Sequence, residues 1–303
     1  MAAGAGHGNK AVVAALFANA GIAVAKFVGF LLTRSSSMLA ESVHSVADSG
    51  NQALLLLGGR RARRVATEAH PFGYGRSRYF WSFVVAVVLF ALGGLFALYE
   101  GYQKLVHPHD VQSPAIAVGI LVVAIGLETA SFRTAIKEAQ PLRGTEGWWS
   151  FIRHSKSPEL PVVLLEDLGA LVGLVIALAG VGLVVVTGDP AWDAYGTLAI
   201  GVLLAVISVV LAVEMKSLLL GEGATPAHLA AIRDAITGAP QVLELLHLQT
   251  QHLGPDELLV AGKVRLDERL TFAEVVTSID AAERRIRDVV PIARVVYLEP
   301  DNA

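Results

Sequence analysis

The chain has 303 residues, of which 54% are hydrophobic and only 17% are charged. Its mean hydropathy of +0.56 is that of a polytopic membrane protein and excludes an ordinary soluble globular protein. The formal net charge of -3 gives no indication of nucleic-acid binding, and the absence of cysteine excludes disulfides and thiolate metal sites.

Apolar stretches of about 20 residues or more predict six transmembrane helices. They cover residues 11–32, 38–58, 79–106, 114–136, 159–187 and 192–220. The segment before the first span is only ten residues long and leads straight into it, so we expect no cleaved signal peptide. A turn signal, Thr187-Gly188-Asp189-Pro190, separates the last two spans.

Basic residues in the loops indicate how the chain is oriented. Two loops hold most of them: Arg60, Arg61, Arg63, Arg64, Arg76 and Arg78 after span two, and Lys137, Arg143, Arg153 and Lys156 after span four. The positive-inside rule makes these loops cytoplasmic, and an even number of spans then makes both termini cytoplasmic. An arginine-rich run between two spans fits a topology determinant or a contact with membrane lipid better than a nucleic-acid patch. The composition favours a bacterial inner (cell) membrane.

The second predicted span carries polar side chains at membrane depth. Ionisable groups are expensive there, so they face a bundle interior or a polar pathway. His44 and Asp48 are four residues apart and therefore share one face of the helix. An imidazole nitrogen and a carboxylate in that arrangement are ligands for a divalent transition metal. The alternative is a hydrogen-bonded pair that only fixes helix packing.

Residues 222–303 are less apolar than the spans before them. They predict a small cytoplasmic α+β domain that follows a transmembrane domain of residues 1–221. Helices are expected at 225–237 and 271–290, and strands at 242–251, 258–266 and 294–298. One apolar stripe is expected along the second helix: Phe272, Val275, Val276, Ile279, Ile286 and Val290. A domain of roughly 80 residues buries little core alone, so we expect it to self-associate.

Motifs along nearly the whole chain resemble the cation diffusion facilitator family, proton-coupled exporters of divalent metals. The matching features are Asn19, Lys26, Ser35-Ser36-Ser37, the H-x-x-x-D of span two, His70-Pro71-Phe72-Gly73-Tyr74-Gly75-Arg76 and Tyr99-Glu100-Gly101. The stretches AESVHSVADSGNQALLLLG and PVVLLED look most like the zinc transporter nine branch. The resemblance implies a homodimer, a tetrahedral metal site between spans two and five, and a ferredoxin-like cytoplasmic domain.

The chain departs from the family pattern in span five, where most members carry a second ligand pair. Asp167 matches the aspartate of that pair, but the position four residues before it is Val163, which cannot bind metal. The protein ligands that remain are His44, Asp48 and Asp167. A fourth ligand is left open between water, Glu166, which lies about 100° around the helix from Asp167, and Glu128 in span four. For both glutamates a structural role is equally open.

Other family positions indicate fewer accessory sites. Tyr74 stands where many members have a second histidine, and Tyr297 and Glu299 replace the usual residues of the last strand. His247 and His252 remain as possible ligands, although surface histidines are the simpler interpretation. Four glycines in span five, Gly169, Gly173, Gly180 and Gly182, are expected to permit close helix approach. Lys26 and Glu100 are expected to snorkel towards the membrane interface.

These observations favour a secondary transporter and not an enzyme. It would export a divalent transition metal, most simply Zn²⁺, from the cytoplasm in exchange for protons by alternating access. Protons and metal compete for the same ligands, and His44 is the natural proton carrier. The alternatives are a non-transporting membrane protein with a degenerate metal site, which Val163 favours, a channel, or a transporter of manganese, iron or cobalt.

Overall fold

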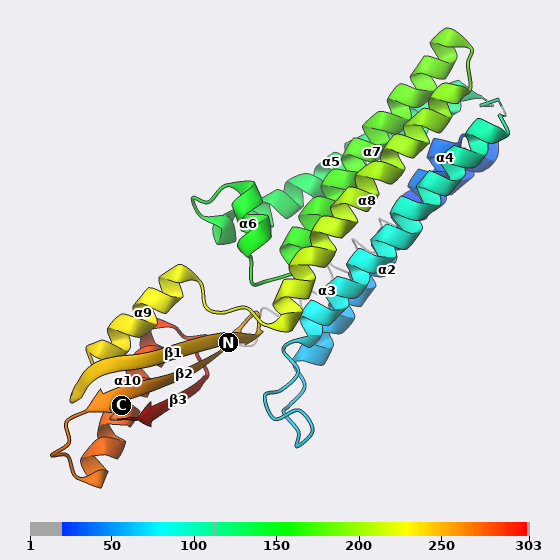
Figure 1. The fold of residues 1–303 in the computed structure, drawn as a ribbon. Helices are drawn as coiled ribbons and strands as arrows, with labels where there is room; N and C mark the ends of the chain where they lie inside the picture. Colours follow the sequence, from blue (N-terminus) through cyan, green and yellow to red (C-terminus); the bar gives the residue numbers. More distant parts are fainter. Residues whose placement is uncertain (1–19, 109, 112, 302–303) are drawn as a thin grey trace. The chain divides into compact units, whose positions relative to one another are not determined.

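The computed structural model describes residues 20–108, 110–111 and 113–301, which form two compact units (Figure 1). One unit is helical and comprises the chain up to Gly58 together with Trp81–Met215. The other comprises Gly59–Phe80 and the chain from Lys216 onward, and it contains a three-stranded sheet.

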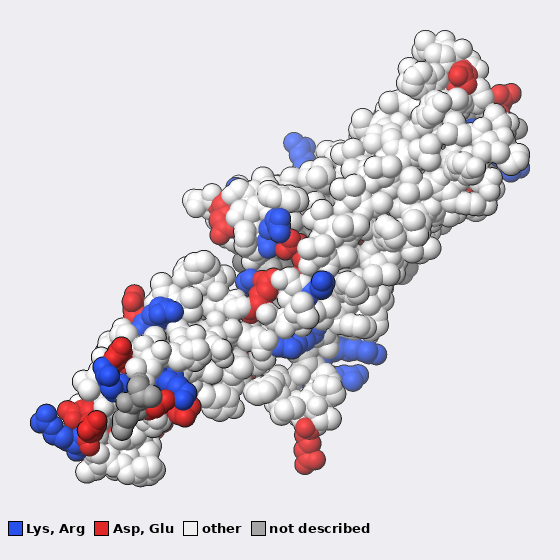
Figure 2. Space-filling view, in the orientation of Figure 1, with Lys and Arg blue, Asp and Glu red and all other residues white. Residues whose placement is uncertain are grey.

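Long helices form the first unit. They are Ala20–Thr33, α2 (Ser36–Ala62), α3 (Ser77–Val88), the π-helical segment η1 (Leu89–Leu95), α4 (Phe96–Val106), α5 (Pro114–Arg143), α7 (Glu159–Thr187) and α8 (Ala191–Leu220). Figure 2 shows the flank of α7 and α8 almost free of charged side chains, as a surface in contact with lipid requires.

Four of the described helices are long and apolar enough to cross a membrane. They are Ser77–Val106, Pro114–Arg143, Glu159–Thr187 and Ala191–Leu220, which correspond to predicted spans three to six. This confirms a helical protein with apolar spans. The count of six stays a prediction, because residues 11–19 of the first span lie outside the described part and α2 is long but rich in polar side chains.

Helix α2 turns its polar side chains inward. Glu41, His44, Asp48 and Asn51 are buried, whereas Val46 is 60% exposed. This is the reverse of a helix in a soluble protein, and it is what a bundle surrounded by lipid requires. The predicted span of residues 38–58 therefore has the expected orientation of its faces.

The third predicted span contains a feature that its apolar sequence does not predict. Between α3 and α4 the chain forms the π-helical turns of η1, which include Gly93 and Gly94. A Cβ atom on Gly94 would lie 3.1 Å from the backbone nitrogen of Ala205 on α8, so only glycine allows this approach. Such π-helical segments occur frequently at functional sites.

Glycines on α7 allow close packing, as predicted for three of the four positions. A Cβ atom on Gly180 would lie 3.1 Å from the Trp192 carbonyl oxygen on α8. One on Gly173 would lie 2.5 Å from Oε1 of Glu41, and one on Gly169 would lie 2.9 Å from the Ile207 side chain. The prediction is wrong for Gly182, which has nothing within 4 Å of the same position.

A short helix that the sequence did not predict, α6 (Trp148–His154), lies between α5 and α7. Its Phe151 packs against a cluster that includes Ala139 of α5 and Leu164 of α7. Arg153 pairs with Glu214 of α8 at 3.0 Å, which fixes the other side of the helix. Seven residues with one buried aromatic are too short for a periodic signal.

The second unit has the predicted order of elements, α-β-β-α-β. They are α9 (Pro226–Thr237), β1 (Val242–Gly254), β2 (Glu257–Leu266), α10 (Phe272–Val289) and β3 (Val295–Pro300). The strands lie in the order β1-β2-β3, with β1 and β2 antiparallel and β2 and β3 parallel. A turn after Gly254 joins the first two strands, and the order of elements confirms the small α+β unit.

The predicted apolar stripe of the second helix is correct for Val275, Ile279, Ile286 and Val290 and wrong for Phe272 and Val276. Ile286 is fully buried, and Val275 and Ile279 pack against the core of the unit. Phe272 is 84% exposed and Val276 is 43% exposed. Phe272 is the first residue of the helix, and Val276 lies about 90° around the helix from the centre of the buried face.

The loop before α3 belongs to the second unit and packs on the β1–β2 hairpin. Arg78 forms an ion pair with Asp256 in the hairpin turn at 2.8 Å. A Cβ atom on Gly75 would lie 2.7 Å from the Leu253 carbonyl oxygen, so the two backbones are in close contact. His70 and Tyr74 stack with ring centres 4.5 Å apart, within the loop itself.

Candidate functional site

His44 and Asp48 lie one above the other on the buried face of α2. Nδ1 of His44 is 3.5 Å from Oδ1 of Asp48. Neither of these atoms, nor Nε2 of His44, has a hydrogen-bond partner among the described residues, although all three are shielded from solvent. Buried polar atoms are normally paired, so three such atoms in one place require an explanation.

Glu166 of α7 faces this pair. Its side chain is buried, as are those of His44 and Asp48. Asn51, one turn from Asp48 on α2, donates a hydrogen bond from Nδ2 to Oε1 of Glu166 at 2.8 Å. The polar face of α2 and a carboxylate of α7 thus form one cluster.

Asp167 faces another helix. Its Oδ2 accepts a hydrogen bond from Oγ of Ser131 on α5 at 3.1 Å, and the residue is only partly buried. Val163, one turn before it, packs against the buried cluster that includes Ala135 and Ala139 of α5. The structure therefore brings Glu166 to the His44 pair and places Asp167 and Val163 at the α5–α7 contact.

Glu128 of α5 is engaged by a lysine. Oε1 of Glu128 lies 3.7 Å from Nζ of Lys26, and the same ammonium lies 3.2 Å from Oε2 of Glu41 and 2.8 Å from Oγ of Ser45. The prediction that Lys26 snorkels to the interface is wrong, because its side chain is completely buried. The ion pairs explain how it tolerates burial.

A second buried cluster lies at the first turn of α2. Asp193 of α8 accepts hydrogen bonds from the Ser35 hydroxyl at 2.8 Å, the Ser36 backbone nitrogen at 2.9 Å, and the Ser37 hydroxyl. Lys104 of α4 is 3.3 Å from the same carboxylate. We did not predict from the sequence that Asp193 contacts these serines. The signals were an aspartate near the start of the sixth span and three serines just before the second.

The Asp193 carboxylate therefore caps α2 from another helix. A capping oxygen normally comes from the helix's own chain neighbour and satisfies amides that the first turn leaves unpaired. Here it also carries a negative charge, which is favourable at a helix N-terminus. This contact fixes the end of α2 on which His44 and Asp48 depend for their placement.

The two predicted accessory histidines do not form a common site. His252 is buried, with Nδ1 3.2 Å from the Gly254 carbonyl oxygen, whereas His247 is exposed on β1. An odd separation of five residues places two strand residues on opposite faces. Across the described residues, no group of three or more His, Asp or Glu side chains has the arrangement of a preformed metal site.

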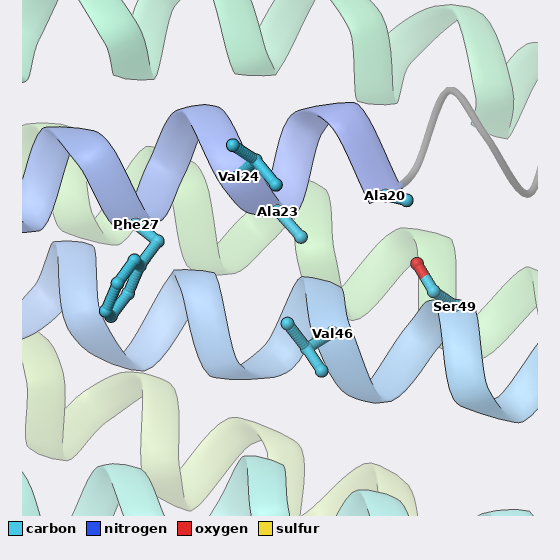
Figure 3. A pocket seen from close by; sticks show the side chains of 6 residues that line it. All are labelled: Ala20, Ala23, Val24, Phe27, Val46 and Ser49. Atoms are coloured by element: carbon cyan, nitrogen blue, oxygen red, sulfur yellow. The ribbon is translucent and has the colours of Figure 1, made fainter.

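An apolar groove of about 340 Å³ lies between Ala20–Thr33 and α2 (Figure 3). Its wall consists of Ala20, Ala23, Val24, Phe27, Val46 and Ser49. Val46 is two residues after His44 and so lies about 200° around the helix from it. The groove is therefore on the opposite face of α2 and offers no set of metal ligands.

Comparison with known proteins identifies the helical region. Residues 12–220 match the model of the cation efflux transmembrane domain. The proton-coupled zinc antiporter SLC30A9, mitochondrial, from Mus musculus is 31% identical over 265 residues, which is 87% of this chain and 46% of that protein. Metal tolerance protein C4 from Arabidopsis thaliana is 31% identical over 82% of this chain and 55% of its own length.

A more distant relative has a similar length. Magnetosome protein MamB from Magnetospira sp. (strain QH-2) is 24% identical over 94% of this chain and 92% of its own length. By contrast, the chain spans about half the length of the SLC30A9 and C4 proteins that it matches. These matches confirm the predicted resemblance, including its zinc transporter nine branch.

Proposed function

The chain belongs to the cation efflux, or cation diffusion facilitator, family of metal transporters, and we propose that it exports Zn²⁺ across a membrane in exchange for protons. Membership of this family makes it a transporter and not an enzyme. Zinc and proton coupling are both named in the SLC30A9 relatives, which supports them for this chain at about 30% identity.

The three unpaired atoms of His44 and Asp48 carry the proposal. An imidazole nitrogen and a carboxylate oxygen at 3.5 Å are ligand types that Zn²⁺ prefers, and a cation between them would satisfy both. We assign Zn²⁺ to this pair as cargo, with Glu166 as the third protein ligand. Asn51 holds Glu166 through one oxygen and leaves the other towards Asp48.

This ligand set differs from the one that the family pattern implies. Glu166 replaces Asp167 because it is on the face of α7 that meets α2, whereas Asp167 bonds to Ser131. Glu128 is left out because Lys26 engages it. Two carboxylates and one imidazole would supply three protein ligands and leave one position of a tetrahedral site for water, the open arrangement from which a bound Zn²⁺ can be released.

Proton exchange follows from the same ligands. His44, Asp48 and Glu166 must be deprotonated to bind metal, so protons that reach them from the far side displace the cation. A rocking motion of helix groups about the site would expose it to one side at a time. The Gly93 and Gly94 segment of η1 lies beside His44, with the Cβ position of Gly93 3.7 Å from Nδ1, where such a motion needs a deformable helix.

The finer topology is part of the proposal. We infer six spans with both termini cytoplasmic, a homodimer, and a ferredoxin-like cytoplasmic domain formed by residues 222–303. The arginine-rich loop after α2 and the basic residues between α5 and α7 support this orientation. The MamB relatives, which are bacterial proteins, support a bacterial inner membrane.

Metal flux in sealed vesicles tests the function. Purified protein is reconstituted with a zinc indicator inside, and Zn²⁺ is added outside with and without a pH gradient, acidic inside. Transport by exchange predicts uptake that the gradient accelerates several-fold. A non-transporting protein gives no uptake in either condition. A channel gives equal uptake in both, and preferential Mn²⁺, Fe²⁺ or Co²⁺ uptake would reassign the metal.

A further inference from the structure

Lys26 stands where two helices, α2 and α5, bring oxygen atoms together. Its ammonium touches Glu41 and Ser45 of α2 at 3.2 and 2.8 Å, and it lies 3.7 Å from Glu128 of α5. Lys26 and Glu41 have no exposed side-chain surface, and Glu128 is 10% exposed. Two carboxylates and a hydroxyl around one position form the hard oxygen environment that divalent cations select.

The oxygen atoms of Glu41, Ser45 and Glu128 carry more negative charge than the Lys26 ammonium neutralises. One ammonium faces two carboxylates, and Oε1 of Glu41 is buried without a hydrogen-bond partner among the described residues. That oxygen is directed at Gly173 of α7, where any larger residue would collide with it. The Glu41 carboxyl therefore has one oxygen on Lys26 and one buried oxygen that lacks a hydrogen-bond donor among the described residues.

The other fully buried lysine of the described chain provides a comparison. Lys104 faces a single carboxylate, that of Asp193, which already accepts hydrogen bonds from Ser35, Ser36 and Ser37. That carboxylate has a full complement of donors. Removing the Lys104 charge would leave no second carboxylate to help to hold a metal ion, whereas removing the Lys26 charge would leave two.

We propose that Lys26 occupies a second divalent-cation position and thereby restricts the transport domain to one metal ion per chain. The inference rests on the proposed function for the meaning of the first site. The Lys26 ammonium contacts Ser45, which directly follows His44 in the chain, so the two positions are neighbours on α2. A divalent ion in place of its ammonium would repel the cargo more strongly than a single charge does. Lys26 is thus a residue that sets the metal stoichiometry.

Counting bound metal in the full chain tests the inference. Wild-type protein, Lys26→Met, Lys26→Arg and Lys104→Met are purified in detergent, checked for a single size-exclusion peak, and dialysed against Zn²⁺ at pH 8. Elemental analysis is expected to give one additional Zn²⁺ per chain for Lys26→Met and none for the other two variants. Adding Glu41→Gln and Glu128→Gln to Lys26→Met should remove that additional ion.

A second set separates this inference from the proposed site. In a His44→Ala, Asp48→Ala background, Lys26→Met should still gain one Zn²⁺. If the wild-type protein and the double alanine variant bind the same amount of Zn²⁺, the proposed His44 and Asp48 site is wrong, whatever the result for Lys26→Met. If Lys26→Met aggregates, Lys26→Gln replaces it, because the amide is neutral and still donates hydrogen bonds. Folded Lys26→Met or Lys26→Gln protein with the wild-type Zn²⁺ count overturns the inference.

Discussion

Glu166 and Asp167 are adjacent in sequence but are expected to differ sharply in function. Glu166 reaches the His44 and Asp48 cluster, whereas Asp167 bonds to Ser131 at the α5–α7 contact. Glu166→Gln removes a metal-neutralising charge and should weaken Zn²⁺ binding about 100-fold or more. Asp167→Asn should change it by less than about tenfold, and calorimetric titration of both variants checks the order. The reverse order would return the ligand role to Asp167.

The missing fourth ligand is expected to be restored at Val162 and not at Val163. Val162 is fully buried and stands four residues before Glu166, so the two share a face of α7. Val162→His should therefore tighten Zn²⁺ by about tenfold and slow its release, since a further imidazole completes a closed tetrahedral set. Val163→His serves as the matched control because Val163 packs beside α5. Tighter binding by Val163→His alone would show that Val163, and not Val162, is on the face of α7 that meets the metal.

Sequence reasoning finds some of these residues and not others for a physical reason. His44 and Asp48 are four residues apart in one helix, and helix geometry alone brings them together. Glu166 and Asp167 sit in a helix that is apolar all round, so no polar stripe indicates which of the two faces α2. The partners of Lys26 come from other helices, and their packing is not encoded in local spacing.

At the scale of elements, the start of α2 depends on a buried ion pair. Asp193→Ala would leave Lys104 charged and unpaired and remove the cap of α2, which should cost about 3 to 5 kcal/mol. Thermal unfolding of the detergent-solubilised protein should show a large drop in Tm for this variant. Asp193→Ala with Lys104→Met should recover much of the loss, because no buried charge then remains. Equal Tm values for the single and double variants would mean that the pair contributes nothing.

The first turn of α10 carries a pH-dependent cap. Glu274 accepts hydrogen bonds from the backbone and side chain of Thr271, and these bonds lower the pKa of its carboxyl. A lowered folded-state pKa gives stability that is present above the unfolded-state pKa and is lost as pH falls through the folded value. Hydrogen exchange, corrected for intrinsic rates, should show first-turn amides losing protection under acid conditions. Glu274→Gln should lack that transition, and an unchanged acid response in this variant would exclude the cap as its cause.

Element boundaries follow from the sequence where one signal dominates. Apolar length predicts the four apolar helices, and Thr225-Pro226 and Gly254-Pro255 mark a helix start and a hairpin turn. The π-helical segment and α6 are different, because Gly94 of the first lies against α8 and Phe151 of the second belongs to a buried cluster with residues of α5 and α7. Both elements make contacts with other helices, and no local sequence pattern predicts such contacts.

At the scale of the whole molecule, the resemblance of scattered motifs was the strongest predictor. Individual residues such as Lys26 and Ser35 have little meaning alone, but their order along the chain indicated the family that the comparisons confirm. The departure from the family pattern at Val163 lies in the same helix, α7, as Glu166, for which a cation contact is proposed.

We propose that the movements of metal and protons are coupled through the cluster of His44, Asp48 and Glu166. The most direct measurement follows both ions in one vesicle preparation, with a zinc indicator and a pH indicator inside and no initial pH gradient. An inward Zn²⁺ gradient should drive protons out of vesicles that contain wild-type protein, and Glu166→Gln vesicles should show neither signal. Zinc entry in wild-type vesicles without any proton movement, or equal signals in both preparations, would contradict coupling through this cluster.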